Sequence, residues 1–272
     1  VDGTLYYYNG IGGEVVIPDG VTVVANDVFR KDNNITKIVF PEGITTIGSG
    51  VARAAMSLEE VIFPTTLETI GDEAFALCYA LEKADLSTTN LKSLGFMTFS
   101  YCISLKEVTL PETPNDGDDN MTYLKMGYES FTHLHSLEKL MVYANIEYMA
   151  NSFSDVPALK EANFYGYLGN VNEFTLSAAK ELIVLNFYGD VGQLGETTID
   201  DWGFMVMRED SATLADLPKL KEVNFYGNVD TIGGFAFSMC PLLENVIFHK
   251  NLNKIEGRIL INIFDAQLYR IQ

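Results

Sequence analysis

The chain has 272 residues, a formal net charge of −19 and 47% hydrophobic residues. This negative charge argues against nucleic acids and anionic membrane surfaces as partners, because both are bound mainly through Lys and Arg. The sequence contains no apolar run of about 18 residues, so we expect no membrane insertion.

Residues 1–13 are aromatic, glycine-rich and turn-forming, unlike the rest of the chain. We expect them to form an N-terminal cap, as a short hairpin over the regular structure that follows. Tyr6, Tyr7 and Tyr8 leave a ligand platform open as an alternative to cap packing. The chain begins without Met, a basic segment or an apolar signal region, so we expect either a processed mature protein or a piece of a longer one.

From residue 14 onward, a short pattern recurs in which an apolar residue is followed by apolar residues three and five positions later. The first residues of these units are Ile35, Leu58, Leu81, Leu105, Leu137, Leu159, Leu182, Leu220 and Leu243. Successive units are 23 residues apart from 35 to 81, and 32, 22, 23, 38 and 23 residues apart from 105 to 243. The pattern L-x-x-L-x-L is the strand segment of a leucine-rich repeat.

The second half of each unit also repeats, as in Ile70-Gly71 followed by Phe75. Glycine allows a turn without a Cβ clash, and the aromatic residue fills the interior of the coil. One unit cannot bury its own apolar side, but stacked neighbours can. We therefore predict an α/β fold, mostly β, in a single domain over residues 1–272. Its architecture is a right-handed leucine-rich-repeat solenoid of about 9–10 coils of ~23 residues, with one long parallel β-sheet.

Two strings carry a family resemblance: FPTTLETIGDEAFALCYALEKADL at 63–86 and TIGGFAFSMCPLLENVIF at 231–248. They resemble the BspA-type leucine-rich repeats of bacterial surface proteins, and the similarity extends over about residues 14–264. The resemblance implies a cell-surface or secreted protein, often one tied to adhesion or host contact.

Three cysteines do not suggest a disulfide framework. Cys78, Cys102 and Cys240 each follow the aromatic position of their unit by three residues, which predicts an interior column of small apolar side chains. Cys78 and Cys102 lie in adjacent coils about 4.8 Å apart, so a bridge between them stays geometrically open, although we expect free thiols.

Residues on either side of the central apolar position point outward from the predicted sheet. The first outward column alternates in charge over six units: Lys37, Glu60, Lys83, Glu107, Lys139 and Glu161. Opposite charges abreast contribute ~0.2–1 kcal/mol per pair, so we interpret this column as a device that fixes the register of a solvated sheet.

The second outward column contains Asn163, Asn186 and Asn224. Their amides are able to hydrogen-bond along the stack, which is the interpretation we favour. The alternative is that they present donors and acceptors to a peptide or sugar.

The next position is proline in the first units (Pro18, Pro41, Pro64 and Pro111). In later units it is Tyr143, Tyr165, Tyr188 and Tyr226, followed by His249. Proline ends a strand because it has no N–H, whereas tyrosine lets the strand continue and stacks ring beside ring. We interpret this row as a candidate contact strip for protein or glycan, because tyrosine is favoured at interfaces. The alternative is that the rings only cover the sheet edge.

Two insertions lie near 112–122 and 195–213. The first is acidic, but Asp116, Asp118 and Asp119 miss the spacing of a calcium loop, so we expect a solvated surface loop. The second carries Trp202 beside an apolar run, which we expect to fold back on the solenoid, with a contact patch as the alternative. The C-terminal segment keeps Ile255 in register without a clear polar cap, which predicts an open end or a dimer face.

No catalytic motif is present, so we predict no enzyme activity and no cofactor. His133 and His135 lie two residues apart in one repeat and His249 takes the place of a tyrosine, and we predict no metal site from them. We predict an extracellular or cell-surface binding or adhesion protein that contacts protein or glycan through the exposed sheet. The alternative is a structural spacer or self-assembly module that associates through the solenoid ends. The candidate ligand-binding residues are Tyr143, Tyr165, Tyr188, Tyr226, Asn163, Asn186, Asn224 and Trp202.

Overall fold

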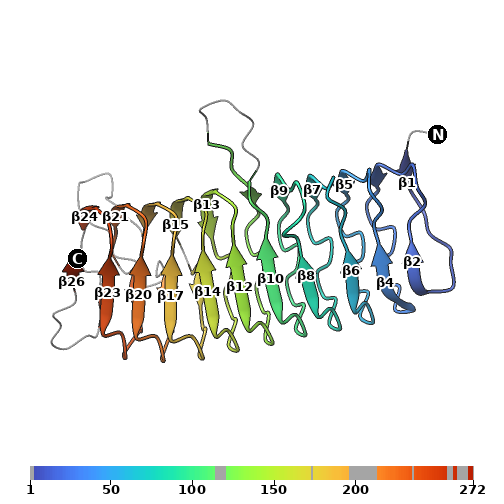
Figure 1. The fold of residues 1–272 in the computed structure, drawn as a ribbon. Coiled ribbons are helices and arrows are strands. Elements are labelled where there is room, and N and C mark those ends of the chain that lie inside the picture. The colour runs from blue at the N-terminus through green and yellow to red at the C-terminus, as the bar shows by residue number, and fades with distance from the viewer. Residues whose placement is uncertain are drawn as a thin grey trace, which may run out of the picture.

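The computed structural model describes residues 3–113, 121–172, 174–195, 213–234, 236–255, 260–261 and 269–271. Within these residues the chain forms strands and turns and no helix, which agrees with the β-rich form of the predicted class. Figure 1 shows the coils side by side in one row, with β1 (Thr4–Leu5) and β26 (Tyr269–Ile271) at opposite ends. The predicted repeat solenoid is confirmed.

The main sheet is parallel and its strands follow one another in chain order. The strands are β2 (Gly13–Val16), β4 (Ile35–Val39), β6 (Glu60–Ile62), β8 (Lys83–Asp85), β10 (Glu107–Leu110), β12 (Lys139–Val142), β14 (Glu161–Phe164), β17 (Val184–Phe187), β20 (Glu222–Phe225), β23 (Asn245–Phe248) and β26. Glu107 lies opposite both Lys83 and Lys139, as the sequence columns predict. The two long units therefore leave the register of this sheet unchanged.

A second side of the solenoid changes along its length. The first coils carry two-residue strands there: β1, β3 (Val23–Val24), β5 (Thr46–Ile47), β7 (Thr69–Ile70), β9 (Ser93–Leu94) and β11 (Lys125–Met126). The later coils carry β13 (Ile146–Ala150), β15 (Leu168–Asn172), β18 (Val191–Leu194), β21 (Val229–Ile232) and β24 (Leu252–Ile255). A third side carries β16 (Leu176–Ser177), β19 (Leu214–Ala215), β22 (Phe237–Ser238) and β25 (Leu260–Ile261).

The N-terminal segment does not form the predicted hairpin. β1 pairs in parallel with β3, while β2 pairs with β4, so the two strands belong to different sides of a first coil. Tyr8 packs edge-on against Phe29 at 5.2 Å between ring centroids, and Tyr7 stays 75% exposed. The glycines between β1 and β2 allow the chain to bend around the coil, so the two strands do not pair as a hairpin.

Phenylalanines fill the interior in columns, as the sequence predicts. Phe75, Phe99 and Phe237 are each at most 1% exposed. Adjacent rings of Phe75, Phe99, Phe131 and Phe153 lie 5.2–5.3 Å apart and nearly parallel. Burying each such side chain contributes about 1.5–3 kcal/mol, and the stack therefore joins neighbouring coils into one core.

The three cysteines are free and buried, as the repeat register predicts. Cys78 Sγ donates to the carbonyl of Ala52 at 3.2 Å, and Cys102 Sγ donates to that of Phe75 at 3.1 Å. Burial raises the pKa of the Cys78 thiol to about 12. These side chains act as small interior groups that also satisfy backbone carbonyls.

Left-handed backbone positions recur at the turns, and the sequence pattern did not reveal them. Non-glycine residues adopt φ between 45° and 64° at two places in several coils, as in the pairs Glu73 and Leu77, Met97 and Tyr101, Glu129 and His133, and Asn151 and Asp155. Each such residue costs roughly 1–2 kcal/mol relative to ordinary backbone. Backbone hydrogen bonds between coils offset this cost, for example from Leu77 N to Ser100 O at 2.9 Å.

Candidate functional site

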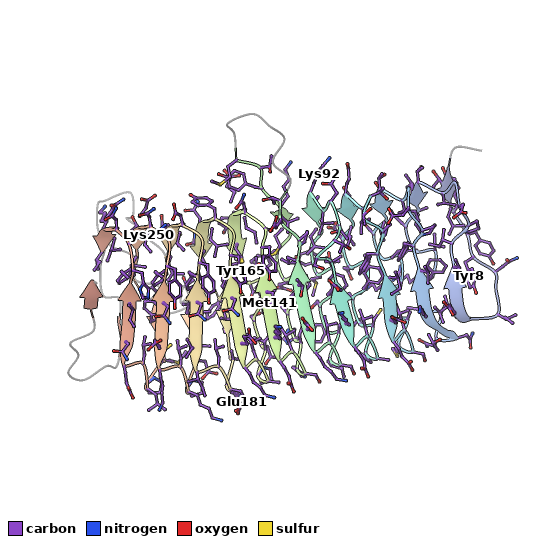
Figure 2. The ribbon with its side chains drawn as sticks, viewed as in Figure 1. Tyr8, Lys92, Met141, Tyr165, Glu181 and Lys250 are labelled. Atoms are coloured by element: carbon purple, nitrogen blue, oxygen red, sulfur yellow. The ribbon has the colours of Figure 1, made fainter. Side chains whose placement is uncertain are left out.

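Three parallel rows of side chains line the outer face of the main sheet over β14, β17 and β20. Because side chains alternate along a strand, residues 222, 224 and 226 all point outward while Val223 and Phe225 point into the core. The first row contains Glu161, Val184 and Glu222, and the asparagines and then the tyrosines follow along the strands. Figure 2 shows Met141 and Tyr165 on this sheet, near the middle of the solenoid.

The tyrosine strip is a continuous stack of rings: Tyr143, Tyr165, Tyr188, Tyr226 and His249. Successive centroids lie 4.6, 4.7, 4.8 and 4.4 Å apart, with interplanar angles of 5–8°. Tyr188 and Tyr226 are 41% and 36% exposed, and the other members are half-buried. The strip therefore presents ring edges to solvent while the ring faces cover one another.

Backbone hydrogen bonds hold the strip in place. The N–H of Tyr165 donates to Val142 O at 2.7 Å, and that of Tyr188 donates to Phe164 O at 2.7 Å. Tyrosine thus continues the strand ladder, as the sequence predicts. Burial raises the pKa of the Tyr165 hydroxyl above its usual value, and the neighbouring rings act in the same direction.

Each of the three central tyrosines is followed by a glycine: Gly166, Gly189 and Gly227. A Cβ on Gly189 would overlap the backbone carbonyl oxygen of Gly166, and one on Gly227 would overlap that of Gly189. The coils therefore approach so closely after the tyrosine that only glycine fits. This contact fixes the ring-to-ring spacing of the strip.

The asparagine row forms a hydrogen-bonded ladder. Asn186 Nδ2 donates to Asn163 Oδ1 at 3.0 Å, and Asn224 Nδ2 donates to Asn186 Oδ1 at 3.1 Å. Asn163 and Asn224 also donate to Glu161 and Glu222, and both are at most 5% exposed. The amides are thus occupied within the sheet, and the geometry favours the structural interpretation of this row.

The first outward column carries charges of alternating sign in the earlier coils, from β4 to β12. Lys37 pairs with Glu60 at 2.9 Å and Lys139 pairs with Glu107 at 4.0 Å, whereas Lys83 turns to Asp85 within its own strand at 3.3 Å. Water and salt screen the attraction within exposed pairs of this kind. These charges therefore help to fix the register of the strands more than they stabilise the fold.

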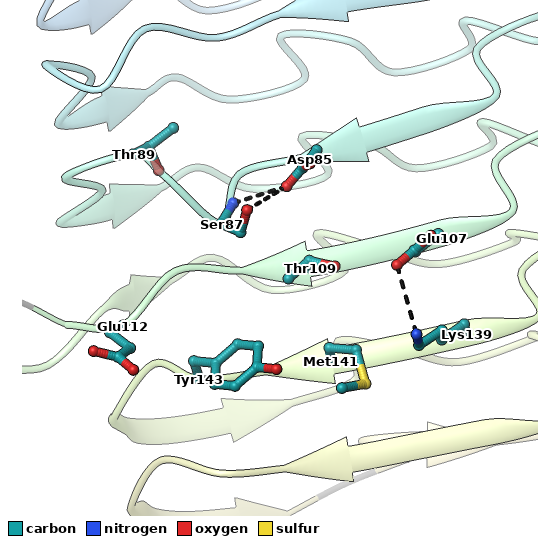
Figure 3. Close-up of a pocket in the computed structure, with 9 residues that line it drawn as sticks. All are labelled: Asp85, Ser87, Thr89, Glu107, Thr109, Glu112, Lys139, Met141 and Tyr143. Atoms are coloured by element: carbon teal, nitrogen blue, oxygen red, sulfur yellow. Dashed lines mark hydrogen bonds and ion pairs between the residues drawn. The ribbon is translucent and has the colours of Figure 1, made fainter.

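A shallow groove of about 630 Å³ adjoins the first ring of the strip. It crosses the outer faces of β8, β10 and β12 and is shown in Figure 3. Its lining residues are Asp85, Ser87, Thr89, Glu107, Thr109, Glu112, Lys139, Met141 and Tyr143. The preceding coil carries Pro111 at the position of the tyrosine ring, so the groove begins where the ring stack ends.

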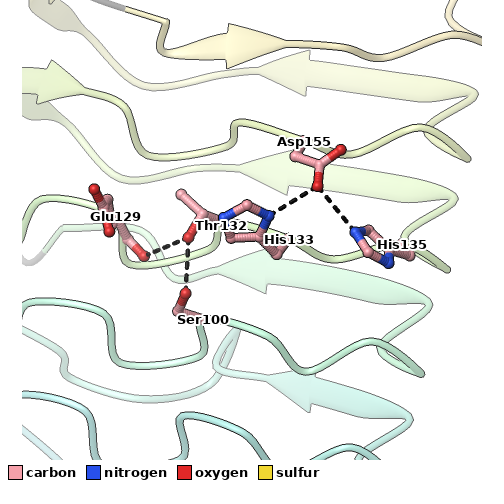
Figure 4. Close-up of polar contacts among 6 residues, drawn as sticks. All are labelled: Ser100, Glu129, Thr132, His133, His135 and Asp155. Carbon is pink, nitrogen blue, oxygen red and sulfur yellow. Dashed lines mark hydrogen bonds and ion pairs between the residues drawn. The ribbon is translucent and has the colours of Figure 1, made fainter.

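Two histidines and an aspartate converge at a second place on the surface, which the sequence did not indicate. His133 Nδ1 and His135 Nε2 lie 2.8 and 2.9 Å from Asp155 Oδ2, as Figure 4 shows. Burial acts to raise the pKa of Asp155, but the hydrogen bonds and charges of both histidines outweigh it, so this pKa lies below its ordinary value. Asp155 is 20 residues beyond His135 and meets it only because the coils stack.

Other predicted residues lie outside the described part of the chain. They are Trp202, the aspartates at 116, 118 and 119, and most of the insertion near 195–213. In the described part of the chain, no helix has the length and apolar character that a membrane crossing requires.

The coil length, the parallel sheets and the aliphatic and aromatic columns together define a leucine-rich-repeat solenoid. The family described as "BspA type Leucine rich repeat region" matches six copies, over residues 4–123, 90–202 and 210–267. The chain therefore belongs to the BspA-type leucine-rich-repeat family.

Solved structures of bacterial leucine-rich-repeat proteins are similar to this fold. The Treponema pallidum leucine-rich-repeat protein aligns with 22% identity and a TM-score of 0.52, over 70% of this chain and 78% of that one. A leucine-rich-repeat protein from Bacteroides ovatus aligns with 20% identity and a TM-score of 0.50, over 90% of this chain and 83% of that one. A search of the curated proteins found no match to this chain.

Proposed function

We propose that this protein is a non-enzymatic binding protein, at the cell surface or secreted, that recognises a partner protein through the outer face of its main sheet. Leucine-rich-repeat families in general serve as protein-interaction scaffolds, and stacked repeats create an extended surface for this purpose. The observation that carries the proposal is the tyrosine strip.

The arrangement of the rings favours a protein partner over a glycan. Sugars stack on the open faces of aromatic rings, but the faces of Tyr165, Tyr188 and Tyr226 are covered by their neighbours at 4.4–4.8 Å. What remains accessible at these three rings is their edges and hydroxyl groups. Such groups combine apolar contact with hydrogen bonding at little cost in side-chain entropy, which suits a protein interface.

The charge of the chain adds a requirement on the partner. With a net charge of −19, the protein attracts basic surfaces from a distance and repels acidic ones. The tyrosine strip then supplies the short-range contact. A partner with a basic patch beside an apolar one fits both features.

The test is a binding screen against host extracellular-matrix proteins and a glycan array, followed by titration of each hit. The variant Tyr165→Ser, Tyr188→Ser and Tyr226→Ser, made in one chain, is expected to weaken binding by at least about 30-fold, since interface tyrosines often contribute 2 kcal/mol or more. Tyr79→Ser removes a tyrosine of similar exposure (37%) outside the strip and is the matched control. Unchanged affinity in the triple variant, or capture of glycans alone, would contradict the proposal.

A second candidate is self-association through the N-terminal end. Within the described part of the chain β2 has a strand on one side only, and nearby Ile11 and Val16 are 98% and 62% exposed. An open edge with exposed apolar residues is a template for pairing with another copy. Light scattering across concentration tests this candidate, and Val16→Lys is expected to abolish any dimer it reveals.

A further inference from the structure

The cluster of His133, His135 and Asp155 has the composition of a metal site. Its three ligand atoms all lie within 4.8 Å of one another, and both imidazole nitrogens already point at one carboxylate oxygen. The side chains are 35%, 50% and 41% exposed, so an ion reaches them from solvent. Within the described part of the chain, no other group of three or more His, Cys, Asp or Glu side chains has this geometry.

The backbone holds two of these residues in equivalent places on adjacent coils. His133 and Asp155 both have left-handed backbone, with φ of 58° and 55°. His133 N donates to Ser154 O at 3.0 Å, which sets the two turns in register. The coil spacing therefore places the carboxylate of one turn beside the imidazole of the other.

Neighbouring contacts restrict the first imidazole further. The Tyr101 ring, one coil earlier, stacks on His133 at 4.2 Å between centroids and an angle of 17°. Beneath it, Thr132 Oγ1 lies 2.8 Å from Ser100 Oγ and 3.4 Å from Glu129 O, so the turn is tied to its neighbours (Figure 4). A pre-positioned ligand loses little freedom when an ion binds, which favours affinity.

We propose that His133, His135 and Asp155 bind a divalent transition-metal ion, with Zn²⁺ as the expected ion. Two imidazoles and one carboxylate suit Zn²⁺, which takes His nitrogen at about 2.0–2.1 Å and carboxylate oxygen at about 2.0–2.2 Å. Calcium and magnesium prefer all-oxygen ligands, so the two imidazoles select against them. The fourth tetrahedral position is open to water or to a side chain of a bound partner.

Metal binding replaces the two hydrogen bonds to Asp155. His133 Nδ1 and His135 Nε2 bind the ion in the tautomer that carries the ring proton on the other nitrogen, which leaves one lone pair on each ligand atom. The Asp155 carboxylate supplies the third ligand atom and a negative charge.

The test uses the whole chain, freed of metal by chelation and titrated with Zn²⁺ by calorimetry, with Co²⁺ as a spectroscopic probe. The expected result is one ion per chain and a Co²⁺ absorption spectrum that shows nitrogen ligation. His135→Ala and Asp155→Asn are expected to weaken Zn²⁺ binding at least about tenfold, since even second-shell changes cost 10–100-fold. Asparagine tolerates left-handed backbone, so Asp155→Asn preserves the turn.

Asp216→Asn is the matched control, because Asp216 has the same left-handed backbone, with φ of 54°, at the corresponding turn of a later coil. Its Zn²⁺ affinity is expected to equal that of the original chain. Equal Zn²⁺ binding by all four proteins, or none by the original chain, would overturn the proposal. Circular dichroism of each variant establishes that a loss of binding does not come from unfolding.

Discussion

The proline coils and the tyrosine coils differ at one position and close in different ways. In the proline coils the chain turns back on itself after the strand, with Ile44 N donating to Pro41 O at 3.4 Å and Leu67 N donating to Pro64 O at 3.2 Å. In the tyrosine coils the same region bonds to the neighbouring coil, as from Ile146 N to Tyr167 O at 2.8 Å.

The loss or retention of one N–H explains this difference. Proline donates nothing to the ladder, and a local turn satisfies the backbone that follows it. Gly43, with φ of 99°, occupies the turn position that favours a left-handed residue. Tyrosine keeps its N–H, so the ladder continues and the second-side strands lengthen from two residues in β5 to five in β15.

The largest effect is expected from a core substitution in the tyrosine coils. Phe187→Ala should lower the free energy of unfolding by about 3–5 kcal/mol, because it leaves a cavity between two stacked rings 5.2 and 4.9 Å away. Phe63→Ala in the proline coils is expected to cost slightly less, since Phe63 stacks in parallel on one side only, at 6.1 Å. Urea unfolding of both variants checks this ranking, and a reversed order would show that stacking adds nothing.

Exchanging the distinguishing residue should cost nearly as much. Tyr188→Pro is expected to lower the free energy of unfolding by about 3 kcal/mol, because it removes both the ring and the 2.7 Å bond to Phe164 O. Tyr188→Ser keeps that N–H and is expected to cost only about 1 kcal/mol, the value of the lost ring contacts. If the two variants unfold at the same urea concentration, the N–H has no part in the difference between the coils.

A methyl group added at the close approach should also have a clear effect. Gly189→Ala is expected to cost about 2–3 kcal/mol, because its Cβ meets backbone that cannot move without separating the coils. Gly43→Ala, where a Cβ meets nothing within 4 Å, carries only the left-handed penalty of about 1–2 kcal/mol. Thermal unfolding of the two variants measures the difference in their stability. A larger loss of stability in Gly43→Ala than in Gly189→Ala would contradict the argument from close approach.

The asparagine ladder is expected to contribute less. Asn186→Ala should cost about 1–3 kcal/mol, since it leaves a buried oxygen of Asn163 and a buried amide of Asn224 each with one hydrogen bond fewer. Thr109→Ala in the same outward column is the control and should change stability by less than about 0.5 kcal/mol. A neutral Asn186→Ala variant would return the row to the candidates for ligand binding.

The smallest effect near neutral pH concerns the cysteines of both regions. Burial raises the pKa of Cys78 and of Cys240 to about 12, so their contribution to stability is complete below the unfolded value of about 8.5 and is lost as the pH rises toward 12. Folded protein is therefore expected to resist iodoacetamide at neutral pH, while the urea-unfolded chain reacts. Rapid labelling of the folded chain would place these thiols outside the interior.

Alignment of the repeats was sufficient to predict the period, the interior columns and the opposed residues of the main sheet. Parallel coils of near-constant length turn a spacing of about 23 residues into direct contact, so Glu107 had to meet Lys139 once the repeats were aligned. The change from proline to tyrosine was also visible in the sequence, because each residue decides whether its own backbone N–H is available.

The contacts that the side chains at those positions make became apparent only in the folded chain. The asparagine amides bond to one another, which depends on distances of about 3 Å that no spacing specifies. The meeting of His133 and His135 with Asp155 depends on left-handed turns that no residue type there requires. Such backbone angles are set by hydrogen bonds between coils, and those bonds exist only after the chain has stacked.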